Sequence, residues 1–453
     1  MSVDLRLSIG ELSRSYADRS LSVVEVISAT LERVATFDPS LRSYLCIRGD
    51  EAMAEAHVRD ADLRAGTVRG PLHGIPVAVK DLIDVEGMTT TGGSVLQRDD
   101  PPAVDAEMVG MLRAAGAIVI GKHNLYEFGL GLPTDGEWPE AARNPWDLAR
   151  IPGGSSSGSA VAVAAALCAG AFGTDTGGSI RGPASYCGVV GLKPTHGTIS
   201  TAGCQALSWT LDHIGPLART VDDAAVLLTG ASGRALEVTD GIDGIRIGVP
   251  RTLMERVDME ADVGLAFEEA VRLIESSGWP VASIELPDLE ITEAALLAII
   301  GSEGLAAHLA TLAERPEAYG RSARERLSGG LVYSGVDYVN ALRVRDVVIE
   351  ELDKLYGEVD VIVSPVTLQV APTNADFQRN PPHRTPFTGI HNLTGGPAMS
   401  VPAGFDQAGM PIGMQIAGPH GADALVLSVA RWYQRATTWH TAVPTVLTEA
   451  ARS

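Results

Sequence analysis

The sequence is poor in aromatic residues, in cysteine and in positive charge. Phe, Trp and Tyr make up 5% of its 453 residues, so we expect a core of Ala, Val, Leu and Ile, which suits helices packed closely on a sheet. Four cysteines without C-x-x-C spacing indicate buried free thiols rather than a disulfide framework or a metal site. They are Cys46, Cys168, Cys187 and Cys204.

Cations are outnumbered: 35 Lys and Arg stand against 56 Asp and Glu, a net charge of −21. A nucleic-acid or anionic-membrane surface needs clustered cations, so we expect neither partner. The apolar run 160–173 is too short to span a bilayer. The first residues lack the basic and apolar segments of a signal peptide. We therefore expect a cytoplasmic protein.

Several familiar catalytic patterns are missing. No two histidines frame a carboxylate at helical spacing, and the loop 153–158 lacks the lysine of a phosphate-binding loop. Ser179 is followed two residues later by Arg181, so it does not sit in a Gly-x-Ser-x-Gly elbow. Four histidines near the glycine-rich motifs lie in turns or at strand ends, which favours structural roles over a Ser-His-Asp base. They are His73, His123, His196 and His213.

The periodicity of the chain indicates an α/β fold. Helical patterns alternate with short apolar strands, as expected of a mixed twisted central sheet covered by helices on both faces. The length fits two or three domains or one large α/β core. Helices are predicted at 8–37 (two, the second capped by Ser22 and ended by Asp38-Pro39), 50–65, 105–114, 263–276 and 422–435, strands at 71–85, 117–120, 245–249, 359–364, 397–403 and 411–417, and a mobile surface segment at 321–330.

Two glycine loops between residues 150 and 182 carry serines. The first loop, around Ser155, precedes the Ala-rich run 160–169, so it is predicted to open a buried helix and to point backbone N–H groups at a ligand. A flexible linker or plain tight turns are the alternatives. A single lysine, Lys80, stands inside the strand-forming segment 71–85, where it is either functional or extends to water from the strand end.

Four motifs together resemble the amidase signature family. They are Val77-Ala-Val-Lys80-Asp, Gly153-Gly-Ser155-Ser-Ser-Gly-Ser, Gly173-Thr-Asp-Thr-Gly-Gly-Ser179-Ile-Arg and Cys187-Gly-Val-Val-Gly-Leu-Lys-Pro194-Thr. The resemblance implies the amidase signature fold in one amidase domain, 1–453. Within it, 70–230 would form the catalytic core, 231–358 a variable region that shapes the pocket, and 359–435 the strands and helix that complete the core.

The resemblance also implies roles for individual residues. Ser179 would be the nucleophile, Ser155 the bridging serine after a cis peptide bond from Gly154, and Lys80 the general base; Ser94 matches a position without a catalytic role. The backbone N–H groups of Thr176, Gly177, Gly178 and Ser179 would form the oxyanion hole, Asp175 and Arg181 would support that loop, and Gly129, Leu130 and Gly131 would line the acyl side. No metal and no cofactor are implied.

The chemistry constrains Lys80. A free lysine titrates near ~10.4, whereas an effective base at neutral pH needs a pKa of about 7–8, so burial must disfavour the charged amine. The expected enzyme is a serine amidohydrolase that cleaves a C–N bond of a small amide, aryl amide, carbamate or ester through an acyl-enzyme. The alternative is a glutaminase like that of the amidotransferases, working with a partner subunit. Formation of a homodimer is left open.

Overall fold

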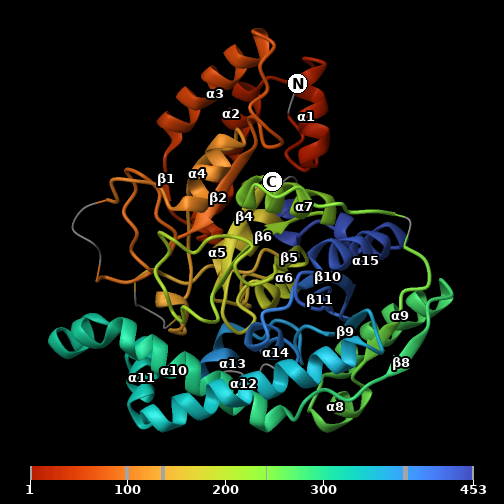
Figure 1. The fold of residues 1–453 in the computed structure, drawn as a ribbon. Helices are drawn as coiled ribbons and strands as arrows, with labels where there is room; N and C mark the ends of the chain where they lie inside the picture. Colours follow the sequence, from red (N-terminus) through yellow and green to blue (C-terminus); the bar gives the residue numbers. More distant parts are fainter. Residues whose placement is uncertain (1–2, 97–100, 134–137, 241, 381–385, 451–453) are drawn as a thin grey trace.

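The computed structural model describes residues 3–96, 101–133, 138–240, 242–380 and 386–450. Within them, eleven strands form one sheet in the order β1-β3-β2-β4-β6-β5-β10-β11-β9-β7-β8 (Figure 1). The pairs of β2 with β3 and β4 are parallel, while those of β10 with β5 and β11 are antiparallel, so the sheet is mixed as predicted. The strands are β1 (Tyr44–Ile47), β2 (Pro76–Lys80), β3 (Ile118–His123), β4 (Gly170–Asp175), β5 (Val190–Lys193), β6 (His213–Ala218), β7 (Ile247–Val249), β8 (Val281–Ser283), β9 (Val361–Pro365), β10 (Ala398–Phe405) and β11 (Pro411–Ala417).

Helices surround this sheet, with α1 to α3 at the top of Figure 1 and α10 to α12 at the bottom. The helices are α1 (Ile9–Ala17), α2 (Val23–Leu41), α3 (Gly49–Arg64), α4 (Glu107–Ala114), α5 (Ser157–Ala164), α6 (Arg181–Cys187), α7 (Val221–Ser232), α8 (Arg251–Arg256), α9 (Ala261–Ser276), α10 (Leu289–Glu314), α11 (Arg321–Gly329), α12 (Gly335–Tyr356), α13 (Asn374–Arg379), α14 (Gly389–Leu393), α15 (Asp423–Ala436) and α16 (Thr445–Ala450), with short 3-10 turns η1 (Glu127–Gly129), η2 (Pro316–Ala318), η3 (Gly330–Val332) and η4 (Trp439–Thr441).

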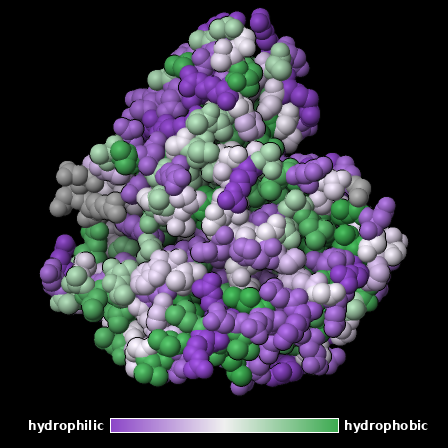
Figure 2. All heavy atoms as spheres, viewed as in Figure 1, coloured by the Kyte–Doolittle hydropathy of each residue, from purple (hydrophilic) through white to green (hydrophobic). Residues whose placement is uncertain are grey.

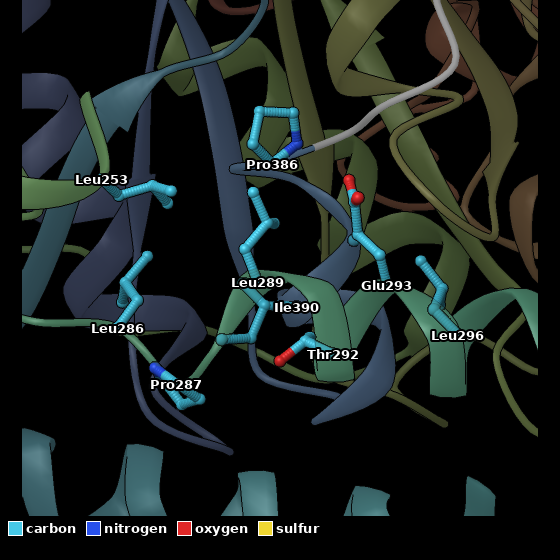
Figure 3. Close-up of a pocket in the computed structure, with 10 residues that line it drawn as sticks. Leu253, Leu286, Pro287, Leu289, Thr292, Glu293, Leu296, Pro386 and Ile390 are labelled. Carbon is cyan, nitrogen blue, oxygen red and sulfur yellow. The ribbon is translucent and has the colours of Figure 1, made fainter. Parts of the chain in front are cut away.

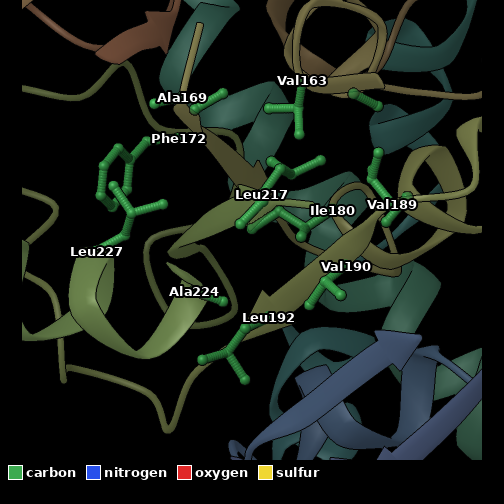
Figure 4. Packing of buried hydrophobic residues seen from close by; sticks show 14 of the residues in the cluster. Val163, Ala169, Phe172, Ile180, Val189, Val190, Leu192, Leu217, Ala224 and Leu227 are labelled. Atoms are coloured by element: carbon green, nitrogen blue, oxygen red, sulfur yellow. The ribbon is translucent and has the colours of Figure 1, made fainter. Parts of the chain in front are cut away.

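The central strand β4 has helices against both of its faces. A Cβ on Gly170 would meet Leu227 of α7, whereas a Cβ on Gly173 would meet Ser156, next to α5. Because side chains alternate along a strand, positions three apart face opposite sides. Figure 4 shows the apolar packing around β4, where Phe172 and Leu227 lie side by side. The predicted helical cover on both faces is therefore confirmed.

The N-terminal helices follow their sequence signals. Ser22 caps α2 in a capping box with Glu25, as its spacing predicts. The expectation that Asp38-Pro39 ends this helix is wrong, because α2 continues to Leu41 with Pro39 in its last turn. The Asp38 carboxylate accepts from the backbone N–H of Ser43 instead, and so fixes the chain just after the helix.

The long helix α10 belongs to an outer layer with α11 and α12. Among the described helices it alone has the length and composition to cross a membrane, with a mean hydropathy of 1.6. The chain therefore contains a longer apolar segment than the run 160–173. Of that apolar window, 39% is buried inside the molecule, mainly against α12. On the face seen in Figure 2, apolar side chains gather over α10 and α11. Exposed apolar residues of this layer include Ile291, Leu297 and Leu309 of α10.

Candidate active site

Lys80 ends β2, the third strand in the order of the sheet, and is fully buried. Its Nζ lies 2.7 Å from Ser155 Oγ and 2.7 Å from Thr174 Oγ1. Among the described residues no carboxylate lies within 4.0 Å of this amine, in contrast to Lys122, which pairs with Asp81 at 2.6 Å. Burial lowers the pKa of Lys80 to about 7, against a smaller opposing effect of nearby acidic groups.

Ser155 stands in the loop that opens α5, and the peptide bond from Gly154 is cis, as the resemblance implies. The loop is held from two sides. The Tyr126 backbone N–H donates to the Ser155 carbonyl at 3.1 Å, and the Tyr126 ring lies so near Gly154 that a Cβ there would come within 2.3 Å of it. The Ser155 hydroxyl is thereby fixed beside Lys80.

Ser179 lies in the turn between β4 and α6 and is half-buried. Its carbonyl accepts from the Ser156 backbone N–H at 3.1 Å, which ties the two serine loops together directly. Thr388 donates through Oγ1 to the Gly177 carbonyl at 2.8 Å and covers Gly178 from the other side. β2 and the α5 loop thus bring Lys80 and Ser155 into contact, and the β4–α6 turn places the backbone of Ser179 against the same loop.

Asp175 and Arg181 hold this turn from beneath. The Asp175 carboxylate accepts from the Gly178 N–H at 2.7 Å, from the Ile180 N–H at 3.1 Å and from Arg181 at 2.9 Å. The adjoining guanidinium is the main attractive influence that keeps the pKa of Asp175 below its usual range, against the cost of burial. Since the Gly178 N–H already donates to Asp175, three of the four predicted donors remain for an oxyanion: those of Thr176, Gly177 and Ser179.

Arg181 reaches the C-terminal part of the chain. Its guanidinium donates to the Thr388 carbonyl at 3.0 Å, to Gln415 Oε1 at 2.7 Å and to Asn392 Oδ1 at 2.6 Å. Sequence reasoning missed these partners, which lie more than 200 residues further along the chain and belong to no recognisable motif. Thr174 was missed as well, although it stands inside the Ser179 motif.

The predicted acyl-side segment lies next to the serines. A Cβ on Gly129 would lie 3.6 Å from Ser155 Oγ, and one on Gly131 would lie 2.7 Å from the Ala323 Cβ of α11. The segment 321–330, predicted to be mobile and on the surface, forms α11 up to Gly329, with Ala323 and Leu327 buried. Its mobility stays a prediction. The polar residues of α11 occupy only one side of the helix, so the apolar side packs over the site.

The remaining candidates lie elsewhere. Ser94 donates to Glu127 Oε1 at 2.5 Å and is buried away from the lysine. No hydrogen bond joins a histidine to Ser155 or Ser179 in the described part of the chain; His123, for example, contacts Ser159 at 3.3 Å. A narrow cavity of about 10 Å³ between α8, α10 and α14 is lined by Leu253, Leu289 and Ile390, among others, and contains none of the motif residues (Figure 3).

Comparison with known proteins agrees with this geometry. A family model described as Amidase matches residues 25–427. The chain belongs to the amidase signature family. It is therefore an enzyme of a family that acts on carbon–nitrogen bonds. In this amidase-family chain the matched region contains the lysine, both serines and the strands that carry them.

Individual relatives span nearly the whole amidase-family chain. A glutamyl-tRNA(Gln) amidotransferase subunit of Desulfatibacillum aliphaticivorans is 35% identical over 484 aligned positions, covering 97% of this chain and 99% of the relative. A crystal structure of an amidase has a TM-score of 0.88 at 33% identity, covering 95% and 99%. The corresponding amidotransferase subunit of Thermotoga maritima has a TM-score of 0.79 at 32% identity, covering 97% and 96%.

Proposed function

We propose that the chain cleaves the C–N bond of a small amide through an acyl-enzyme on Ser179. The observation that carries this proposal is the buried Lys80 amine, 2.7 Å from Ser155 Oγ and without a carboxylate partner among the described residues. An amine with a pKa of about 7 is substantially neutral at neutral pH, so it is able to accept a proton. Ser155 then relays the proton from Ser179.

The proposed reaction conserves its protons. Ser179 Oγ attacks the carbonyl carbon while its proton passes to Ser155, whose own proton passes to Lys80. The protonated lysine returns a proton by the same route to the leaving nitrogen, and the C–N bond breaks. Water then attacks the acyl-enzyme with the same base, which releases the acid. The N–H groups of Thr176, Gly177 and Ser179 are the proposed donors to the oxyanion.

The pocket suggests what the acyl group carries. The backbone of Gly129, Leu130 and Gly131 is proposed to line it, under the cover of α11. From that helix Arg326 reaches the Leu130 carbonyl at 3.4 Å, and no carboxylate lies within 4.0 Å of its guanidinium among the described residues. An unpaired guanidinium attracts a carboxylate. A substrate that combines a carboxamide with a carboxylate, as glutamine does, fits this arrangement.

Two versions of this chemistry remain, and they differ in the fate of the ammonia. Free-standing hydrolysis is the first expectation. The curated relatives favour the second, a glutaminase of the amidotransferase type that works with a partner subunit, because they are named glutamyl-tRNA(Gln) amidotransferase subunits at 34–36% identity over nearly the full length. The net charge of −21 argues that any contact with tRNA would be made by the partner. A cytoplasmic location is part of both versions.

The test is a substrate panel with wild type and Ser179→Ala. Glutamine, other primary amides, p-nitroanilides and carbamates are assayed for ammonia or amine release, and the acyl adduct is sought on the Ser179 peptide by mass spectrometry. We expect wild-type turnover and an adduct that Ser179→Ala lacks. Equal activity in the two proteins would refute the nucleophile. Glutamine preference together with a co-purifying subunit would select the amidotransferase; turnover of other amides by the isolated chain would select the hydrolase.

A further inference from the structure

Two carboxylates, the half-buried Asp212 and the buried Glu303, hold the segment 207–212, which lies between the serine loops and the outer helices. Asp212 immediately precedes β6, whose first residue pairs with Asp175 of β4. Glu303 lies on α10 and is 1% exposed. Neither carboxylate forms an ion pair within the described residues, so hydrogen bonds from neutral groups must compensate their burial.

Asp212 joins this segment to the proposed oxyanion loop. Its Oδ1 accepts from Thr176 Oγ1 at 2.6 Å, and its Oδ2 accepts from the backbone N–H groups of Leu207 at 2.8 Å and Ser208 at 3.0 Å. Thr176 is the first residue after β4 and one of the three remaining oxyanion donors. Its backbone is therefore oriented by a side chain that is itself held on two further bonds.

Glu303 holds the same segment from the outside. Its carboxylate accepts from Ser208 Oγ at 2.6 Å, from Thr210 Oγ1 at 2.9 Å and, across to α12, from the Tyr338 hydroxyl at 2.8 Å. Ser208 is shared, because its N–H donates to Asp212 and its hydroxyl to Glu303. A continuous chain of hydrogen bonds thus runs from α12 through α10 to Thr176.

We propose that Asp212 is a positioning residue that sets the oxyanion loop through Thr176, and that Glu303 anchors it to α10 and α12. The inference rests on the proposed cleavage at Ser179. A preorganised donor stabilises the transition state only if its direction is fixed beforehand. Loss of the hydrogen bonds that Asp212 and Glu303 accept therefore lowers kcat, while ground-state binding of the acyl group is largely kept.

Asp212 also has an electrostatic effect that separates it from a purely structural residue. It interacts with Lys80 of β2 and with Cys204, whose thiol is kept neutral because burial raises its pKa to about 12. Burial raises the pKa of Asp212 itself to about 6, so its carboxylate is charged above that pH. The negative charge of Asp212 raises the pKa of Lys80. Removal of that charge therefore lowers the pKa of Lys80 and moves the acidic limb of kcat/KM to lower pH.

The test compares Thr176→Val, Asp212→Asn and Glu303→Gln, with Thr30→Val as a buried control in α2. We expect Thr176→Val to lower kcat by about 10-fold or more with little change in KM, somewhat less than the loss of a direct oxyanion donor. Asp212→Asn lowers kcat at least as much and also moves the acidic limb to lower pH. Glu303→Gln lowers kcat without moving that limb, and Thr30→Val changes neither.

Two further measurements keep the proposal open to refutation. The double variant Thr176→Val/Asp212→Ala should lose no more kcat than Asp212→Ala alone, since either change removes the hydrogen bond between these two side chains. Faster amide hydrogen exchange at 176–179 is expected in Thr176→Val and Glu303→Gln even where no substrate is turned over. If Thr176→Val kept the wild-type kcat and the wild-type rate of amide hydrogen exchange, the positioning role of Asp212 would be refuted. If the wild type turned over no substrate but the variants showed the expected exchange, only the proposed cleavage would be refuted.

Discussion

Among the residues that the structure describes, three lysines are fully buried, and their surroundings separate their roles. Lys122 pairs with Asp81 at 2.6 Å. Lys193 donates to the carbonyls of Pro194 at 3.1 Å and Gly396 at 2.5 Å. Lys80 contacts two hydroxyls, which donate and accept equally well. Only the last arrangement lets the amine exchange a proton without breaking its contacts.

The titration of Lys80 predicts the pH dependence of the reaction. The proposed base Lys80 must be neutral to accept a proton, and burial lowers its pKa to about 7. We expect kcat/KM to rise about tenfold per pH unit below 7 and to level off above it. Lys80→Ala should nearly abolish activity. A flat profile between pH 5 and 9, with Lys80→Ala still active, would contradict the assignment.

The free energy of unfolding gives a second test of Lys80, with Lys122 as the matched control. A lysine with a folded-state pKa below its unfolded value destabilises the fold near neutral pH, and this penalty fades as pH rises toward ~10. Lys80→Met should therefore raise the free energy of unfolding at pH 7, by about 2 kcal/mol once the lost hydrogen bonds are subtracted. Lys122→Met should lower it by roughly 3 kcal/mol because Asp81 is left unpaired. Urea denaturation measures both.

Among single residues, the sequence predicts the proposed catalytic residues better than the residues that hold their loops in place. Lys80, Ser155 and Ser179 are recognisable from four short motifs, and the structure places the first two in contact. The sequence also predicts that Asp175 and Arg181 support the loop that carries Ser179, and both contact it or each other. It does not predict Asn392 and Gln415, because a buried polar residue in a distant segment carries no local signal of the cation that it faces.

Among the elements, α11 covers the acyl-side loop. Gly131 lies against Ala323 so closely that any Cβ would overlap it. We expect Gly131→Ala to push α11 outward and to raise KM by about 10-fold or more with a smaller effect on kcat. Steady-state kinetics on the best substrate of the panel measures this change.

A rescue and a control accompany that variant. Ala323→Gly in the Gly131→Ala background removes the overlapping methyl and should restore KM. Gly329→Ala, in the last turn of α11 with nothing within 4 Å of the added Cβ, should leave KM unchanged. An unchanged KM in Gly131→Ala would show that α11 does not shape the pocket.

Elements with a clear period are predicted closely, and those set by tertiary contacts are not. The predicted helix at 50–65 is α3, Gly49–Arg64, and the segment at 359–364 is β9, Val361–Pro365. By contrast, the Ala-rich run 160–169 is helical only to Ala164. Ala166 adopts a positive φ of 54° there, so the chain turns back to begin β4 at Gly170. Alanine propensity alone does not encode that turn.

For the whole molecule, the sheet makes the sequence segments interdependent. β5 pairs with β6 on one side and with β10 on the other, so the sheet of the 70–230 segment is completed by a strand from 359–435. We expect residues 1–358 produced alone to show no cooperative thermal transition, whereas the full chain melts in one. Circular dichroism melting of both proteins measures this, and a sharp transition in the shorter chain would show that residues 1–358 fold without the strands of 359–435.

The distant partners of Arg181 affect when the loop around Ser179 forms during synthesis of the chain. The turn that carries Ser179 is complete only when Thr388, Asn392 and Gln415 have arrived around the guanidinium. A ribosome therefore makes the proposed nucleophile Ser179 and Lys80 long before it makes the groups around Arg181. We therefore expect the proposed cleavage at Ser179 to be withheld from the nascent polypeptide until translation is nearly finished.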